Sequence, residues 1–298
     1  MLYRARQAIG YARLNRACRP ILDTAPIRPA DGPTVLSMVS GRDFLLYLVA
    51  AKSFHAQIGT GRFYVIDDGT LSDGQRAALA SHLGATICPI ADIPMGPTPR
   101  GGTWERLLRI ADLVRESYVV QLDSDTLTVG PLDEVRAAIA DDASFTLVTH
   151  PGITYGSIAE ACAVARADPA TDIHTVAEQV LDVAADPTTG RYVHGCSGFA
   201  GFPRGCFGRD DVYRFSAAIE SVLGRRWWEW GSEQITSNFI VSNAPRVAAI
   251  PYPKYRNYEG EPLAGDTAFI HFLGTYRFRR GYYAARVRAT LAALRTGN

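Results

Sequence analysis

The chain has 298 residues, of which 47% are hydrophobic and 20% charged, and its formal net charge is +1. This composition indicates a globular protein with a sizeable core in one large or two modest domains. It excludes a transmembrane helix, because no apolar run approaches the roughly 18 residues that a span requires, and the opening MLYRARQAIG lacks the apolar core of a secretion signal.

Cysteine usage points to a reducing compartment. The five cysteines are odd in number and never stand in a CxxC spacing, so neither a disulfide framework nor a zinc cluster is indicated. Reduced thiols are the default for proteins inside the cell. We therefore expect a cytoplasmic protein.

Both ends of the chain are basic. The first nineteen residues contain no acidic residue, and neither does the segment from His271 onward; their arginines are Arg4, Arg6, Arg13, Arg16 and Arg19, and Arg277, Arg279, Arg280, Arg286, Arg288 and Arg295. An anionic substrate, an anionic membrane surface or a nucleic acid would each explain this charge. A solvated helix face is a simpler explanation for the N-terminal set.

Residues 1–33 form a basic arm that ends in a Pro-containing stretch, and strand-like and helix-like segments then alternate. Short apolar runs predict strands at residues 35–40, 63–66, 85–90 and 118–122. Helix-spaced apolar residues predict helices at residues 44–58, 72–83 and 104–116, the second of them capped by Ser72. This βαβαβαβ order predicts an α/β fold with a mostly parallel central sheet flanked by helices.

The second half of the chain is less regular. A helix is predicted over residues 158–183, because Ile173, Val176, Val180 and Val183 follow one face. A Gly-rich turn, HGCSGFAGF at residues 194–202, comes next. Helices at residues 211–223 and near 233–241, and a short strand at residues 268–271, complete the prediction.

The strand at residues 118–122 ends in the most informative motif of the chain, Asp123 and Asp125 one residue apart. Parallel sheets bind their ligands beyond the carboxyl ends of the strands, where these two aspartates, Asp67 and Asp68 are expected. Paired carboxylates in such a place suit a hard divalent cation, Mg²⁺ or Mn²⁺, that keeps coordination positions open for phosphates. Taken alone, a turn that ends the strand explains the pair equally well.

The order of several motifs resembles the family 8 glycosyltransferases, nucleotide-sugar enzymes of the GT-A fold. The resemblance spans about Val35 to Arg280, and its motifs are FYVIDDGTLSD (63–73), ERLLRIADL (105–113), YVVQLDSDT (118–126), CSGF (196–199), SEQITSN (232–238) and HFLGTYR (271–277). It implies one GT-A domain over residues 34–298 after the basic arm. It also implies sugar transfer from a nucleotide donor, a UDP-sugar, with Mn²⁺ or Mg²⁺ as cofactor.

The resemblance also assigns site residues. Asp123, Asp125 and His271 would bind the metal, and Asp123 would contact the nucleotide sugar as well. Arg277 would add a second cation, and Gly274 would let the backbone approach the phosphates. Residues expected near the nucleoside are Asp68 and Arg106 and, with weaker support, Val39 and Ser40.

Gln234 falls on the glutamine that faces the anomeric carbon in the family, with Glu233 beside it. Family 8 enzymes retain the anomeric configuration, which implies retention here. Ile235 stands where the family has an Asp, Cys196 replaces an Asn, and the segment from Arg277 departs from Lys-Pro-Trp. These differences leave the donor sugar open.

The acceptor is less defined. Trp227, Trp228 and Trp230 precede the helix that carries Gln234 and would stack on a sugar ring, although core packing or an interface better explains at least two of them. Residues 151–191 carry no family motif and are a second candidate for acceptor binding. We expect a glycan or lipid-linked acceptor, peripheral contact with an anionic membrane at its inner face, and no nucleic-acid partner.

Three other functions share some of these sequence features. A haloacid dehalogenase-type phosphatase requires Thr or Val four residues after its first Asp, and Leu127 occupies that place, which excludes it. A sugar nucleotidyltransferase would share the sheet and the metal, but SGRDF (40–44) is a poor match to its Gly-rich signature. A non-catalytic nucleotide-sugar-binding protein remains the third alternative, because Ile235 departs from the family pattern.

Overall fold

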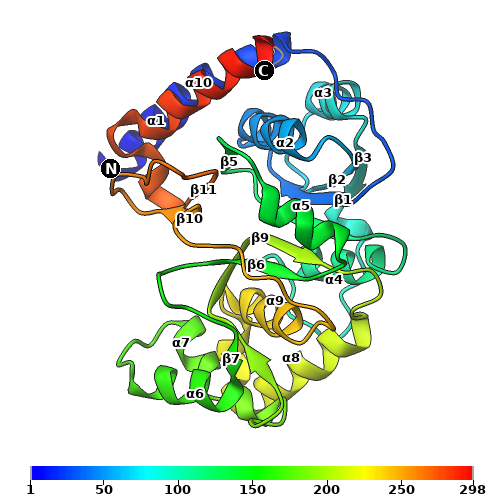
Figure 1. Ribbon diagram of the computed structural model, residues 1–298, viewed down its shortest axis with the longest axis vertical. Helices are drawn as coiled ribbons and strands as arrows, with labels where there is room; N and C mark the ends of the chain where they lie inside the picture. The colour runs from blue at the N-terminus through cyan, green and yellow to red at the C-terminus, as the bar shows by residue number, and fades with distance from the viewer. Residues whose placement is uncertain (1, 297–298) are drawn as a thin grey trace. The chain divides into compact units, whose positions relative to one another are not determined.

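The computed structural model describes residues 2–296 and the side chains of residues 7–295. The protein has the predicted α/β fold, with a mostly parallel central sheet flanked by helices (Figure 1). Two compact units divide the chain. The first comprises the chain up to Pro89, Leu122–Asp133 and the chain from Pro251, and the second comprises Ile90–Gln121 and Glu134–Ile250. The division into an arm, residues 1–33, and one domain, residues 34–298, stays a prediction.

The first unit contains three parallel strands of the central sheet in the order β3-β2-β1. Its elements here are β1 (Thr34–Val39), α2 (Phe44–Ile58), β2 (Arg62–Asp67), α3 (Asp73–Leu83) and β3 (Thr86–Pro89), close to the predicted bounds. Ser72 caps α3 as expected, since its hydroxyl accepts a hydrogen bond from the Gln75 amide. Val39 lies opposite Asp67, so the carboxyl ends of β1 and β2 are adjacent.

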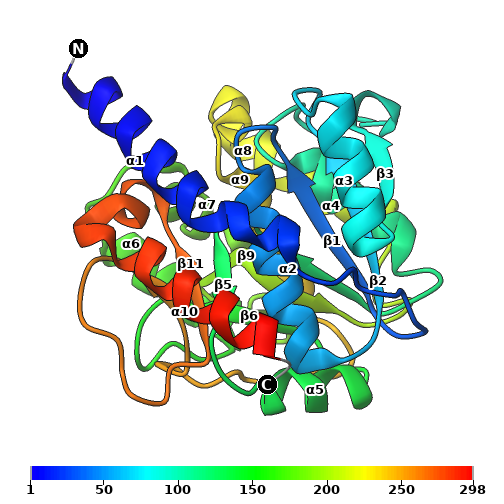
Figure 2. The same cartoon turned by 90° about the horizontal axis from the view of Figure 1, so that it is seen from above.

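A second sheet and two terminal helices complete the first unit. The sheet has the order β10-β11-β5 and consists of β5 (Thr126–Thr128), β10 (Tyr255–Tyr258) and β11 (Phe269–Phe272). The helices α1 (Leu2–Cys18) and α10 (Tyr282–Thr296) lie side by side, and both contact α2 (Figure 2). The sequence predicts β11 but not β5, β10 or α10. Two 3-10 segments, η1 (Arg19–Asp23) and η5 (Gly274–Gly281), adjoin the terminal helices.

The second unit carries the sheet strands β4, β9 and β6, in that order. Strand β6 runs antiparallel to β9, and β7 pairs with β8 in a separate two-stranded sheet. Its elements are η2 (Ile90–Asp92), α4 (Trp104–Leu113), β4 (Val119–Leu122), α5 (Asp133–Ala140), β6 (Phe145–Val148), β7 (Gly156–Ser157), α6 (Ile158–Ala167), α7 (Ile173–Glu178), η3 (Leu181–Val183), β8 (Arg191–Tyr192), β9 (Gly195–Phe202), α8 (Arg209–Leu223), η4 (Gly224–Trp228) and α9 (Ser232–Ser242).

The prediction of a Gly-rich turn at residues 194–202 is wrong. Residues Gly195–Phe202 form the strand β9, and all eight of them are buried. Neighbouring side chains leave no room for a Cβ at two of its glycines. A Cβ on Gly195 would lie 2.5 Å from Thr146 Cγ2, and one on Gly201 would lie 2.2 Å from the Tyr118 hydroxyl. The glycines therefore allow close packing inside a strand.

The single helix predicted over residues 158–183 is also wrong. Helix α6 ends at Ala167, one residue before Asp168-Pro169, because the residue before a proline disfavours helical backbone. Asp172 then starts α7, since its side chain accepts hydrogen bonds from the amides of His174 and Thr175.

Among the described residues, none of the helices has the length and apolar character needed to cross a bilayer.

Candidate functional site

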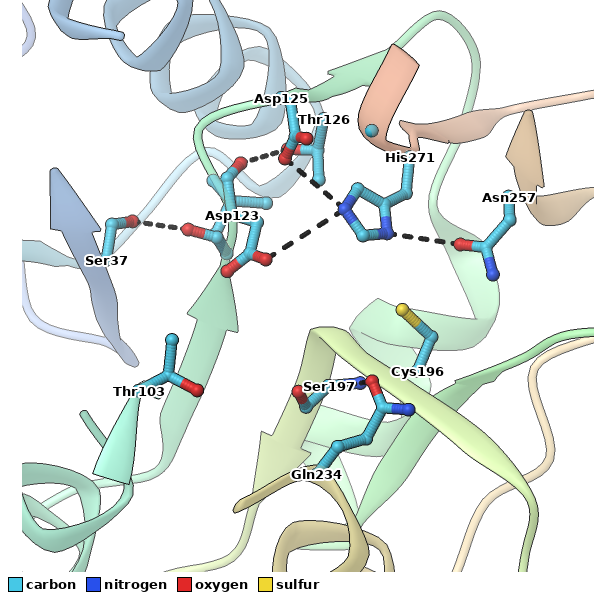
Figure 3. Close-up of polar contacts among 12 residues, drawn as sticks. Ser37, Thr103, Asp123, Asp125, Thr126, Cys196, Ser197, Gln234, Asn257 and His271 are labelled. Atoms are coloured by element: carbon cyan, nitrogen blue, oxygen red, sulfur yellow. Dashed lines mark hydrogen bonds and ion pairs between the residues drawn. The ribbon is translucent and has the colours of Figure 1, made fainter. Parts of the chain in front are cut away.

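The structure brings together the three side chains that the resemblance names as metal ligands. One donor atom from each of Asp123, Asp125 and His271 lies within 4.8 Å of the others. His271 Nε2 is 3.3 Å from Asp125 Oδ1 and 3.9 Å from Asp123 Oδ2 (Figure 3). His271 and Asp125 are buried, whereas the Asp123 side chain is 27% exposed. The cluster is therefore buried on most sides but accessible to solvent through Asp123.

Strand pairing explains why residues so distant in sequence meet. Asp123 and Asp125 follow β4, and β5 begins at the next residue, Thr126. In the antiparallel pair of β5 and β11, Thr126 lies opposite His271. The Phe272 amide also donates to the Asp125 carbonyl at 2.9 Å. The register of this small sheet thus fixes His271 beside Asp125.

Asn257 on β10 is a residue that the sequence analysis did not identify. It lies opposite His271 in the parallel pair of β10 and β11, and its Oδ1 is 3.1 Å from His271 Nδ1 (Figure 3). An amide oxygen only accepts hydrogen bonds, so Nδ1 is the donor and Nε2 is the nitrogen that faces the carboxylates. Only the strand register reveals this role, because nothing in the local sequence marks Asn257.

The surroundings of Asp125 keep it ionised. Burial alone would raise the pKa of this carboxyl, but the charge and hydrogen bond of His271 and the charge of Arg277 outweigh it. The pKa of Asp125 is therefore lowered to about 2. At neutral pH the carboxylate is in the form that binds a cation.

Arg277 of η5 lies against the same carboxylate. Its Nη2 forms an ion pair with Asp125 Oδ2, and its Nε donates to the Gly274 carbonyl at 2.9 Å. Its Nη1 is 3.9 Å from Asp43 Oδ1 and 3.3 Å from the Tyr11 hydroxyl. Only 14% of the Arg277 side chain is exposed, so these contacts define its position.

Gly274 adopts a backbone conformation that suits glycine. Its φ is +43°, and a Cβ placed there would meet no atom within 4 Å. Backbone conformation, not crowding, is therefore what favours glycine at this position. The space above its backbone is open to a ligand.

The residues expected near the nucleoside in the first unit lie at the ends of β1 and β2. The Asp68 amide donates to the Val39 carbonyl at 3.3 Å. The Asp68 carboxylate accepts from the Thr70 amide at 2.9 Å and from its hydroxyl at 2.6 Å. The Ser40 hydroxyl donates to Asp43 at 2.9 Å. Val39, Ser40 and Asp68 therefore share one edge of the sheet.

Arg106 and Glu233 form a buried ion pair in the second unit. Arg106 Nη2 is 3.3 Å from Glu233 Oε2, and the two side chains are 5% and 1% exposed. The hydroxyls of Thr103 and Ser197 approach the same Oε2 at 2.8 and 3.4 Å. These contacts join α4, α9 and β9. Buried ions require such partners, so the pair also helps to hold these elements together.

Gln234 is held by the start of β9. Its Oε1 accepts from the Ser197 amide at 3.1 Å and lies 3.5 Å from the Ser197 hydroxyl (Figure 3). This contact fixes the orientation of the side-chain amide, because its oxygen is the acceptor. The two N–H groups of Gln234 then point away from Ser197.

The three tryptophans before α9 differ in environment. Trp227 is fully buried, and its Nε1 donates to the Ser216 hydroxyl at 2.9 Å. Trp228 and Trp230 are 55% and 76% exposed. Core packing therefore explains only Trp227.

The donor set fits a hard divalent cation. Two carboxylates and one imidazole provide the ligand types that Mn²⁺ accepts, and they leave coordination positions for other oxygens. Asn257 orients the imidazole, as partners of metal-bound histidines commonly do. The residues present thus suit a catalytic metal that shares its coordination sphere with a substrate.

No family model matches the chain, and no curated protein matches it. Among solved structures, it is similar to the galactosyltransferase LgtC in complex with donor and acceptor sugar analogs, with a TM-score of 0.51 and 15% sequence identity. An active-site mutant of LgtC gives a TM-score of 0.53 and 15% identity. Both comparisons cover 87% of this chain and 95% of the other. The protein therefore has the fold that its motifs predict, the GT-A fold of these glycosyltransferases.

Proposed function

We propose that the protein is a metal-dependent glycosyltransferase. It moves a sugar from a nucleotide-sugar donor, a UDP-sugar, to a glycan, a lipid-linked molecule or another acceptor, with retention of configuration. The observation that supports this most directly is the convergence of Asp123, Asp125 and His271 in a GT-A fold. Sheets of this class bind ligands beyond the carboxyl ends of their strands, where the two aspartates follow β4.

Asp123, Asp125 and His271 would hold Mn²⁺ or Mg²⁺, with Asn257 orienting the imidazole. When bound, this cation supplies fixed positive charge that stabilises the diphosphate leaving group. Arg277 adds a guanidinium beside the same carboxylate. Gly274 leaves its backbone open to the phosphate oxygens.

We assign Val39, Ser40, Asp68 and Arg106 to the nucleotide and Gln234 to the reacting sugar. The contact of Gln234 Oε1 with Ser197 supports the second assignment, because it leaves the N–H groups of the amide available to a sugar oxygen. The buried ion pair of Glu233 with Arg106 supports a positioning part for Glu233 next to Gln234.

A screen of nucleotide sugars with Mn²⁺, measuring nucleotide release, tests the proposal. Asp125→Asn and His271→Gln should each reduce the rate by about 10²–10³-fold, the usual loss when an electrostatic stabiliser is removed. Asp73→Asn is the matched control, since Asp73 is a fully exposed carboxylate that pairs with Arg76 on α3. Full activity in either site variant would contradict the proposal.

The same screen separates the alternatives. A nucleotidyltransferase would release pyrophosphate from a nucleoside triphosphate and a sugar phosphate. A non-catalytic binding protein would bind the donor without releasing nucleotide. Retention is tested by the anomeric configuration of the product in an NMR spectrum.

We also propose cytoplasmic location with peripheral contact at the anionic inner face of a membrane, which would favour a lipid-linked acceptor. Arg13 and Arg16 of α1 and Arg286 and Arg288 of α10 are exposed on adjacent helices, which supports the idea. The side chains of Arg4 and Arg6 lie outside the described residues. Vesicles with anionic lipid should sediment the protein, whereas zwitterionic vesicles should not. Equal sedimentation with both kinds of vesicle would contradict the proposed membrane contact.

A further inference from the structure

Tyr11 of α1 reaches the neighbourhood of the metal cluster. Its hydroxyl accepts a hydrogen bond from Arg277 Nη1 at 3.3 Å. The Arg42 guanidinium lies over the Tyr11 ring, 4.4 Å from its centroid, and the ring meets Phe278 edge-on with centroids 4.8 Å apart. The aromatic ring is thus held on two sides while its hydroxyl faces Arg277.

The position of α1 is fixed by close packing. A Cβ on Gly10 would lie 2.7 Å from Phe278 Cδ1, so glycine is what lets the helix approach η5 at this point. Leu14, Ala17 and Cys18 are buried farther along the helix. Helix α1 also lies alongside α10 and contacts α2 (Figure 2). Tyr11 is therefore carried by a helix that packs against other elements of the first unit.

Arg277 passes this constraint on to Asp125. The guanidinium holds Asp125 Oδ2, which leaves Oδ1 as the oxygen that faces His271 Nε2 at 3.3 Å. An unrestrained arginine side chain can adopt many rotamers. Each contact that already restricts the rotamers of Arg277 lowers the entropy that is lost when its guanidinium holds the Asp125 carboxylate in one orientation. The Tyr11 hydroxyl is one such restraint, and the Gly274 carbonyl is another.

We propose that Tyr11 is a positioning residue for the metal ligand Asp125 and acts through Arg277. The inference rests on the proposed function, because it takes Asp125 to be a metal ligand. It gives the N-terminal helix, which precedes the first strand of the sheet, a part in the site. Residues that hold or orient a metal ligand commonly influence metal affinity in this way.

Calorimetric titration of the full-length protein with Mn²⁺ tests the inference. Tyr11→Phe keeps the ring between Arg42 and Phe278 and removes only the hydroxyl. It should raise the Kd for Mn²⁺ about 3–10-fold, less than the 10–100-fold typical of a direct partner of a metal ligand. Tyr282→Phe is the matched control, because its hydroxyl likewise accepts from an arginine, Arg286 Nε at 2.7 Å, and should leave Kd unchanged.

A double variant distinguishes positioning from general stability. If Tyr11 acts through Arg277, adding Tyr11→Phe to Arg277→Lys should weaken Mn²⁺ binding no further than Arg277→Lys alone. In nucleotide-release assays, Tyr11→Phe should raise the half-saturating Mn²⁺ concentration, and saturating Mn²⁺ should restore the rate. A loss of general stability would not be repaired in this selective way.

The outcomes separate the two proposals. Wild-type Mn²⁺ affinity in Tyr11→Phe, or additive effects in the double variant, would overturn the role of Tyr11 and leave the metal site intact. A wild-type protein that binds no Mn²⁺ would overturn the proposed metal site and, with it, the role of Tyr11.

Discussion

Asn257 determines which nitrogen of His271 faces the two carboxylates. Replacing Asn257 with Ala removes the acceptor for His271 Nδ1. The imidazole can then rotate or change tautomer, so Mn²⁺ affinity should fall about 10–100-fold. Titration calorimetry measures the change. Asn257→Asp keeps an acceptor oxygen and should bind Mn²⁺ more tightly than Asn257→Ala; equal affinities for both variants and the wild type would show that the contact is dispensable.

The carboxyl of Asp67 links the stability of the first unit to pH. Burial would raise the pKa of Asp67, but hydrogen bonds from the Gly69 amide, the Arg76 side chain and the Leu71 amide lower it overall. A carboxyl with a lowered pKa in the folded state stabilises the fold above its unfolded pKa of about 3.9. That stabilisation is lost as the pH falls through the folded pKa.

Asp67→Asn should therefore cost about 1–3 kcal/mol of unfolding free energy at pH 7, and should make stability less sensitive to acid. Urea denaturation at pH 7 and at pH 3 measures both effects. Asp73→Asn is the control, because Asp73 pairs with the same Arg76 but is fully exposed, and surface pairs contribute little. A similar loss at both positions would mean that burial of Asp67 is unimportant.

Strand β9 depends on its glycines for packing. A Cβ on Gly201 would lie 2.2 Å from the Tyr118 hydroxyl and 2.3 Å from Phe145 Cε1. Gly201→Ala should therefore lower the unfolding free energy by about 1–3 kcal/mol, the usual cost of overpacking a core. Gly208→Ala is the control, since its nearest neighbour would be Asp211 Oδ2 at 3.9 Å. Equal stability of the two variants in urea would refute the packing argument.

Strand β9 is also an element that the sequence pattern predicts wrongly. Regular alternation predicts β1, α2, β2 and α3 to within a residue or two, because each element has its own apolar period. Strand β9 contains three glycines, and a glycine-rich segment predicts a turn. The neighbouring side chains that crowd these glycines are not known from the sequence. β5 and β10, at three and four residues, are too short to show a period of their own.

Some residues of the candidate site can be predicted from the sequence, and others cannot. Asp123, Asp125 and His271 can be predicted, because the order of their motifs along the chain resembles that of the family 8 glycosyltransferases. Asn257 and Tyr11 cannot, since their contacts arise from the pairing of β10 with β11 and the docking of α1. Sequence motifs point to the three candidate ligands, whereas the residues that support them follow from tertiary structure.

Asp123, Asp125 and His271 bring together segments that are far apart in the sequence. Within the first unit, Leu122–Asp133 carries Asp123 and Asp125, and the chain from Pro251 carries His271. A cation that binds all three side chains only in the folded state must raise stability by mass action. At a free Mn²⁺ concentration 100-fold above Kd the gain is about 2.7 kcal/mol, and a gain of this size raises the Tm of a large domain by about 5–10 °C.

Differential scanning calorimetry with Mn²⁺ and with EDTA measures this shift. Asp125→Asn should lose most of the response, because one ligand carries no charge and the contact with Arg277 is weakened. Asp73→Asn should respond like the wild type, since its carboxylate is exposed and pairs with Arg76. If Mn²⁺ raised the Tm of Asp125→Asn as much as that of the wild type, the cation would be stabilising the protein from another place, and the convergence of the three side chains would not be its cause.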